Sequence, residues 1–356
     1  MAARNITRIP PDAFVHIRTR SLDLGDNWLD DDAIAVDAFR GLERLLESLS
    51  LKENGLPSVP VDSISPLSEL RSLRLERNNI THLDARTFIN NTELRELYLY
   101  ENHIHHIDPD AFYGLHKLEH LKLMSNDLAR IPMGVFRGLR RLASLDLSKN
   151  LIHELPADTF QDLSGLKWLE LQGNQLHNLS RTTFRGLRKL RHLKIEMNPI
   201  RNLDRKTFKV IRKLRYLSMD IIYVEGLNPK IFKGLRKLKM LSVGDADTER
   251  LPRGLFSPLS GLRFMTVFNT TGHFDSLSER LFDPDADISR LNIFVAPLRS
   301  CRCNVSWINA LTSRGVWIRG QCGSRGRHQR RLSCLVPGRR TSLLEKVTTQ
   351  LANTGD

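Results

Sequence analysis

Residues 118–139 read LEHLKLMSNDLARIPMGVFRGL, and the spacing of their apolar residues decides the fold. The frame is LxxLxLxxNxLxxIxxxxFxxL, and residues 142–163 repeat it at the same positions. The leading leucine returns at one constant interval, at Leu46, Leu70, Leu94, Leu118, Leu142, Leu166, Leu190, Leu214, Leu238 and Leu262. A short fixed period of this kind is typical of a solenoid, in which copies of one small unit stack on each other.

Each position of the frame has a predicted role in the folded unit. Alternate side chains of a strand point to opposite sides, so the leucines of the LxL step face the core and their neighbours face solvent. Stacking pairs these short strands into one parallel sheet, and the later Leu or Ile and the Phe fill the space behind it. We therefore predict an α/β-type solenoid, a curved right-handed horseshoe. Its parallel β-sheet lines the concave face, and irregular coil and 3-10 turns form the convex face.

An asparagine at the ninth position is predicted to turn inward where the strand ends, because its amide satisfies backbone groups that water cannot reach. It recurs in seven successive units, at Asn54, Asn78, Asn102, Asn126, Asn150, Asn174 and Asn198. In the next three units Ile222, Ala246 and Thr270 replace it, and we expect distorted turns there.

The spacing changes at both ends of the array. Leu291–Ile293, the next strand-like segment, follows Leu262 later than the regular interval predicts. We expect loops at 269–275 and 284–288 to absorb the difference.

At the front, Asn27 aligns as a ninth position, with Leu22 and Leu24 before it, and the acidic run 30–32 lengthens that unit. Before this unit, the later inward positions of a partial unit are occupied by Ile6, Ile9 and Phe14. The chain is therefore expected to begin inside a repeat or cap, with a cap and a signal sequence upstream.

Composition limits the function classes. Lys and Arg number 54 against 40 Asp and Glu, and the net charge of +14 favours an anionic partner or surface. No apolar run reaches the roughly 18 residues needed to cross a bilayer. Residues 1–10 lack the apolar stretch of a secretory signal. All four cysteines lie between Cys301 and Cys334, which favours a locally cross-linked module in an oxidising compartment.

The array resembles the extracellular leucine-rich-repeat proteins, a group that includes Toll-like receptor ectodomains, variable lymphocyte receptors and Slit-like guidance proteins. The resemblance covers about residues 5–345. It implies four parts: a partial N-terminal repeat or cap remnant at 1–18, a repeat array at 19–293, a C-terminal cap at 294–347 and a disordered tail at 348–356.

The cysteine segment resembles the C-terminal cap of that group, through the CxC pair, Trp307 and the stretch from Gly315 to Cys322. The resemblance implies disulfide bonds between Cys301 and Cys322 and between Cys303 and Cys334. In an alternative pairing, Cys334 is the third cysteine of the cap and the fourth lies beyond residue 356. A zinc site is the less favoured interpretation, because CxC lacks the usual spacing of zinc ligands.

No phosphate-binding loop, metalloprotease motif or nucleophile elbow occurs, so we expect no enzyme, no cofactor and no metal. The histidine cluster of His103, His105 and His106 falls on a turn, where solvated side chains are the better interpretation than a metal site. Glycosylation motifs occur at six sites, namely Asn5, Asn79, Asn90, Asn178, Asn269 and Asn304.

Two surfaces are candidate binding sites. The first is an apolar and aromatic stripe on the concave face, formed by the third and eighth positions of successive units: Trp168, His192, Met197, Tyr216, Ile221, Met240 and Phe264. The second is a basic ridge on the convex side, suited to a sulfated glycosaminoglycan: Arg137, Arg140, Arg141, Arg185, Arg188, Lys189, Lys209, Arg212, Lys213, Lys233, Arg236 and Lys237. Glycans or the irregular loop near Asn269 could instead cover the stripe, and the ridge could be a simply solvated face.

The sequence thus predicts a non-enzymatic recognition protein, outside the cell or at its surface. It would bind a protein or glycan ligand on the concave face, as an innate-immune or receptor-like molecule. The alternative is a non-catalytic subunit that stabilises a secreted enzyme, or a matrix component. Specific nucleic-acid binding is not expected, because no aromatic side chains are interleaved with the ridge. The sequence does not indicate the oligomeric state.

Overall fold

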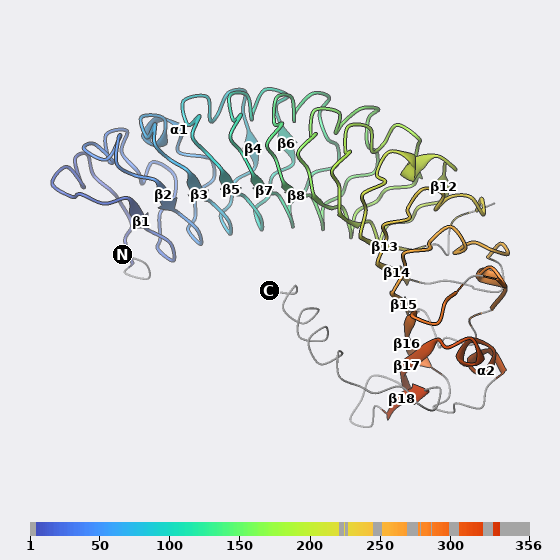
Figure 1. The fold of residues 1–356 in the computed structure, drawn as a ribbon. Coiled ribbons are helices and arrows are strands. Elements are labelled where there is room, and N and C mark those ends of the chain that lie inside the picture. Colours follow the sequence, from blue (N-terminus) through green and yellow to red (C-terminus); the bar gives the residue numbers. More distant parts are fainter. Residues whose placement is uncertain are drawn as a thin grey trace.

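The computed structural model describes residues 5–220, 224, 227–244, 251–268, 277, 279–285, 287–298, 306–322 and 330–334. Over these residues the chain winds into stacked coils that follow an arc, and one strand of each coil lies on the inner side of the arc (Figure 1). The predicted solenoid with a concave parallel sheet is confirmed.

The inner strands of the described residues form one 14-stranded sheet. They are β1 (Ser21–Asp23), β2 (Ser48–Ser50), β3 (Ser72–Arg74), β5 (Glu96–Tyr98), β7 (His120–Lys122), β8 (Ser144–Asp146), β9 (Trp168–Glu170), β11 (His192–Lys194), β13 (Tyr216–Asp220), β14 (Met240–Gly244), β15 (Phe264–Phe268), β16 (Asn292–Leu298), β17 (Trp317–Cys322) and β18 (Arg330–Cys334). Neighbouring strands pair parallel, except β17 and β18, which pair antiparallel.

Short elements interrupt the coil on the outer side of the arc. Two pairs of very short strands also run parallel there, β4 (His82–Leu83) with β6 (His106–Ile107) and β10 (Asn178–Leu179) with β12 (Asn202–Leu203). The described helices are also short: α1 (Val61–Ile64), the 3-10 turns η1 (Thr207–Lys209) and η2 (Glu279–Leu281), and α2 (Ser306–Ser313). The convex face is therefore mostly irregular, as the frame predicts.

The repeat period sets the register of the sheet. Ser144 pairs with Trp168, Trp168 with His192 and His192 with Tyr216, each one period apart. Ser21 pairs with Ser48, so the first full unit is longer, as its acidic run predicts.

The last step of the array is longer than one period, as the sequence predicts. Phe264 pairs with Asn292. Phe264 holds the third position of its unit, and its strand partner Asn292 holds the same position in the next. The strand-like segment at Leu291–Ile293 is therefore placed where the sequence predicts it, after a lengthened step.

A column of phenylalanines fills the space behind the sheet. Phe184 stacks on Phe208 with ring centroids 6.1 Å apart, and Phe208 on Phe232 at 6.2 Å. All three side chains are fully buried, as are the apolar residues at the LxL positions of their units. Phe208 is covered on both faces by rings of other units, so its burial depends on units that are separate in sequence.

The ninth-position asparagines form the predicted ladder. Asn150 Nδ2 donates to the carbonyl oxygens of Leu147 at 3.1 Å, Ser148 at 3.1 Å and Leu123 at 2.9 Å. Its Oδ1 accepts from the Leu128 backbone N–H at 3.1 Å. Leu123 and Leu128 belong to the preceding unit, so one side chain closes its own turn and ties two coils together. Asn27 makes the same bond to Leu24, which confirms its alignment.

The strands lengthen where the ladder ends. The inner strands from β1 to β11 are shorter than β13, β14 and β15, each of which has five residues. In the regular units an asparagine amide binds the carbonyl at the sixth position, as at Leu147. Without the asparagine that carbonyl needs another partner, and continued strand pairing supplies one. The replacements themselves, Ile222, Ala246 and Thr270, lie outside the described residues.

Both ends of the array extend its core. Ile9 and Phe14 are buried, and Phe14 stacks on Phe39 at 5.8 Å, as the partial first unit predicts. At the other end Trp307 of α2 is buried and β17 continues the sheet. The expected disulfide bonds stay a prediction, because Cys301, Cys303 and the side chains of Cys322 and Cys334 lie outside the described residues.

Candidate functional site on the concave face

A row of rings crosses the concave face. Trp168, His192 and Tyr216 begin three adjacent strands, and their side chains point away from the leucines that follow them. The Trp168 and His192 rings stack with centroids 5.0 Å apart and an interplanar angle of 11°. The His192 and Tyr216 rings follow at 6.1 Å and 27°. The third position of the frame therefore builds one continuous ring surface, and 38% of Trp168 is exposed.

Apolar side chains continue this row. Tyr216 pairs with Met240 and Met240 with Phe264, and both new members are partly exposed. Met197 stands at the turn after β11, where it is 69% exposed and has a φ of 56°. The same left-handed backbone recurs at the eighth position of other units, as at Ser125 and Lys149, so it belongs to the repeat turn, and only the apolar side chain distinguishes Met197. Ile221, the other eighth-position member of the predicted stripe, lies outside the described residues.

The sequence reasoning missed one aromatic residue. Phe294, at the fifth position of its unit in β16, is 37% exposed and pairs with Thr266. Its neighbours Ile293 and Val295 are buried, so Phe294 faces the same side of the sheet as Phe264. Reading the fifth position of the frame together with the third would have found it.

The N-terminal half of the concave face is different in character. Arg74 Nε donates to Glu76 Oε1 at 2.9 Å, and the Arg74 guanidinium also lies over the Tyr98 ring. Glu96 accepts from Ser72 and from the Tyr98 hydroxyl. These polar groups bind one another, so this half offers little exposed apolar area. On the described concave face, exposed large apolar side chains therefore gather in the units from Trp168 onward.

A buried carboxyl lies beside the rings. Burial raises the pKa of Glu196, although a hydrogen bond with Ser218 opposes the shift. Its Oε2 has no hydrogen-bond partner among the described residues. Burial also lowers the pKa of His192, and the nearby Arg191 and Arg215 lower it further, so the imidazole stays neutral at neutral pH.

Glu196→Gln should stabilise the fold at pH 7 by about 1 kcal/mol, because it removes a buried charge with an unpartnered oxygen. The folded-state pKa lies above the ordinary 4.5, so the folded chain binds more protons than the unfolded chain between these two pKa values. This carboxyl therefore weakens the fold progressively as pH rises through that interval. Chemical denaturation at pH 7 and pH 4 checks this, and the gain should vanish at pH 4. The exposed Glu154→Gln is the control; an equal gain there contradicts the explanation.

All twelve residues of the predicted basic ridge are exposed. The ridge is not continuous, because Gln161, Ser164 and Gly165 occupy the same three positions in the unit between Arg141 and Arg185. A second basic column was missed: the residue just before each strand is cationic in five successive units, at Lys167, Arg191, Arg215, Lys239 and Arg263. The second position of the repeat frame, compared across successive units, would have shown this column in the sequence.

The other candidate sites from the sequence are the histidine cluster and the glycosylation asparagines. His103 Nδ1 lies 3.5 Å from Asp127, and no metal-binding group of three His, Cys, Asp or Glu gathers among the described residues. Four of the six glycosylation asparagines are described, and all four are exposed: Asn5, Asn79, Asn90 and Asn178. Asn269 and Asn304 lie outside the described residues. No described helix has the length and apolar character to cross a membrane.

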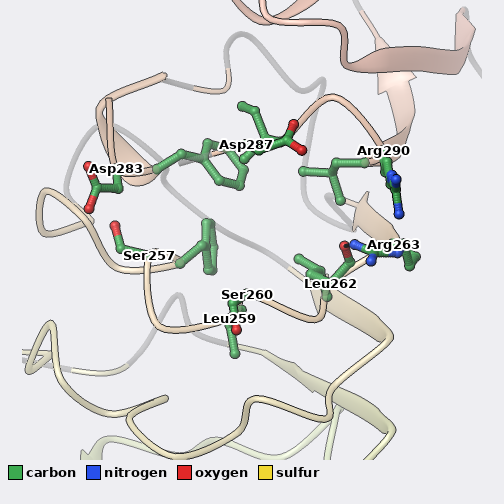
Figure 2. A pocket seen from close by; sticks show the side chains of 12 residues that line it. Ser257, Leu259, Ser260, Leu262, Arg263, Asp283, Asp287 and Arg290 are labelled. Carbon is green, nitrogen blue, oxygen red and sulfur yellow. Dashed lines mark hydrogen bonds between the residues drawn. The ribbon is translucent and has the colours of Figure 1, made fainter. Parts of the chain in front are cut away.

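A small pocket opens between the turns of the last two repeat units (Figure 2). Its volume is about 40 Å³, and its lining includes Phe256, Phe282, Arg263, Arg290 and Asp287. A cavity of this size holds a few water molecules. It accompanies the longer last step of the array.

Comparisons with known proteins agree with this architecture. The leucine rich repeat family model matches residues 68–128, 120–176 and 165–220. TLR13, solved in complex with ssRNA13, has a TM-score of 0.75 and 25% identity over 91% of this chain and 47% of its own. No curated protein matches by sequence.

Two further solved structures share the fold. Toll, in the Toll–Spatzle complex of Drosophila, has a TM-score of 0.64 and 19% identity over 89% of this chain and 48% of its own. A chain of the octameric complex of Latrophilin 3, Unc5D and FLRT2, in which FLRT2 contributes leucine-rich repeats, has a TM-score of 0.64 and 23% identity over 90% of both chains. This chain thus spans about half the length of TLR13 and Toll.

The repeat frame, the asparagine ladder, the single parallel sheet and these matches give one result. The chain has the leucine-rich-repeat fold, and its architecture is similar to that of Toll-like-receptor ectodomains.

Proposed function

We propose that this chain is a non-enzymatic recognition protein that binds a protein ligand through the concave face, outside the cell or at its surface. The observation that carries the proposal is the ring row of Trp168, His192 and Tyr216, continued by Met240 and Phe264. Exposed apolar surface of this kind marks interaction sites, and Trp and Tyr are the preferred anchors. The proposed organisation keeps the array at 19–293 and the cap at 294–347.

The neighbours support a protein ligand. Toll is in complex with Spatzle, and FLRT2 is in a complex with Latrophilin 3 and Unc5D. TLR13 is in complex with ssRNA13, but the ring row here fits bases poorly. Inserting a base between two rings needs twice the ~3.5 Å van der Waals contact distance. The Trp168 and His192 centroids are only 5.0 Å apart, so the ring faces are already occupied by each other.

The double variant Trp168→Asp with Tyr216→Asp should lose ligand while the fold is kept. Two anchors of this kind are worth at least about 2 kcal/mol together, so binding should weaken at least about 30-fold. A photo-cross-linking amino acid at Met240 samples the stripe, and the same group at the exposed Arg205 samples the outer side. Both proteins are incubated with the secreted proteins of the source organism, and the adducts are identified by mass spectrometry.

We expect a specific adduct from position 240 that the double variant abolishes. The matched control places aspartate at two exposed apolar positions outside the stripe, Tyr113 and Met133, and should leave the adduct intact. Circular dichroism and thermal unfolding verify that each variant folds. Equal adducts from positions 240 and 205, or an adduct that survives the double variant, would contradict the proposal.

The second candidate is a non-catalytic subunit that stabilises a secreted enzyme, or a matrix component. The stripe also fits a permanent partner, because a long apolar row suits an obligate interface. Purification from the native source distinguishes the two. A stoichiometric enzyme that remains bound through gel filtration supports the subunit, and a chain that elutes alone supports the receptor-like protein.

A further inference from the structure

The positive charge of the chain is concentrated in three neighbouring units. Residues 181–244 contain 18 Lys and Arg against 4 Asp and Glu, a net charge of +14. The whole chain also has a net charge of +14, so the rest of it is neutral overall. The charge is therefore a local feature of these units.

The solenoid stacks these cations along one edge of the sheet. The Arg191 N–H donates to the Lys167 carbonyl at 2.9 Å, Arg215 to Arg191 at 2.7 Å and Lys239 to Arg215 at 2.8 Å. Adjacent members of the column are therefore about 4.8 Å apart, the spacing of neighbouring strands. Two more cations precede the buried leucine of each unit. We call these nine exposed residues the basic edge: Arg188, Lys189, Arg191, Arg212, Lys213, Arg215, Arg236, Lys237 and Lys239.

The same column is neutralised in the N-terminal half. Arg71 Nη1 lies 2.8 Å from Glu47, Arg20 lies 3.4 Å from the same carboxylate, and Arg95 lies 3.5 Å from Glu119. No residue of the basic edge has a carboxylate within 4.0 Å in the part of the chain that the structure describes. Within the described residues, one architectural position thus holds ion pairs in one half and cations without a carboxylate partner in the other.

Unpaired like charges on adjacent strands destabilise a sheet, because each repels its neighbours. A polyanion along the edge relieves this repulsion and releases its own counterions as it binds. The basic edge thus lacks charge compensation within the described chain, and a linear anionic partner would supply it.

We propose that the basic edge binds a sulfated glycosaminoglycan chain that lies across the three units. Single-stranded nucleic acid adds base stacking to its charge contacts, and it binds grooves in which aromatic faces are available. The basic edge contains no aromatic residue, and the adjacent rings of Trp168, His192 and Tyr216 cover each other. A sulfated polysaccharide needs only the cations. This site replaces the longer convex ridge, because residues 161–165 separate Arg137, Arg140 and Arg141 from it.

The test measures binding of a size-defined heparin oligosaccharide to the whole chain at several salt concentrations. Arg191→Glu with Arg215→Glu should weaken binding at least about tenfold and flatten its salt dependence, because each cation that contacts the polyanion contributes to counterion release. The control Arg205→Glu with Lys206→Glu makes the same charge change on exposed residues just after β12, on the outer side. It should change binding by less than about twofold.

Each result decides the proposal. Equal losses in the two variants would mean that net charge alone attracts heparin, and the basic edge would be abandoned as a site. Equal or tighter wild-type binding of single-stranded RNA of matched charge would overturn the glycosaminoglycan assignment. Thermal unfolding verifies folding, and at low salt the edge variant should unfold no earlier than the wild type. Because the test reads heparin and not a protein ligand, its outcome is independent of the concave stripe.

Discussion

Asn150→Ala should lower the free energy of unfolding by about 3–5 kcal/mol, a loss of the size seen only for buried networks and cavities. The side chain makes four hydrogen bonds to backbone groups of two units. It is 4% exposed, so water has little access to the groups that the substitution leaves without a partner. Each orphaned buried group costs about 1–3 kcal/mol before the coil relaxes.

Chemical denaturation, monitored by circular dichroism, measures this loss. The control is Asn202→Ala, because Asn202 is exposed and its side chain binds only Asn178 among the described residues. That variant should lose less than about 0.5 kcal/mol. Equal losses from the two variants would show that the buried asparagine is not a structural element of the turn.

Phe208→Ala should cost about 3–5 kcal/mol, the usual range for removing a buried ring. Phe208 stacks on Phe184 and Phe232, so the variant removes two ring contacts at once. In a solenoid, stability is a sum of unit terms and neighbour terms. The gap at Phe208 should therefore weaken the coupling between the units on either side of it as well as the total stability.

Tryptophan fluorescence from either side of Phe208 separates the loss of total stability from the loss of coupling between units. Fluorescence of Trp168 and Trp28 reports on units N-terminal to the gap, and Trp307 and Trp317 report on the other side. Single-tryptophan versions should show separated midpoints in Phe208→Ala and coincident midpoints in the parent. Phe208→Leu, which keeps most of the volume, should cost less than about 1.5 kcal/mol and keep the midpoints together. Coincident midpoints in Phe208→Ala would contradict the neighbour-coupling account.

The architecture could be predicted because one period carries it. Once Leu118 is aligned with Leu142, every strand partner in the regular units follows, and Asn126 is placed at a turn by the same counting. The third position could be assigned to the concave face for the same reason, since strand geometry alternates. The fold and the location of the ring row therefore required no knowledge of packing.

The features that could not be predicted depend on what neighbouring units do together. The greater length of β13 arises because a carbonyl without an asparagine takes a partner from the next strand. The burial of Glu196 is set by its surroundings in the folded chain, which a linear frame does not show. Whether a cation at the second position is neutralised depends on the adjacent units: Arg71 pairs with Glu47 of the preceding unit, whereas the same position on either side of Arg215 holds the cations Arg191 and Lys239.

The asparagine ladder also gives the solenoid a direction. Asn150 binds backbone groups at Leu123 and Leu128, which the ribosome has already made when residue 150 emerges. Asn126 and Asn174 bind backward in the same way. Because chains fold from the N-terminus during synthesis, each new coil docks on one that is already folded, and its asparagine satisfies the turn groups that the earlier coil left open. Growth of the horseshoe can therefore keep pace with translation, one coil at a time, and only the newest coil has unsatisfied turn groups.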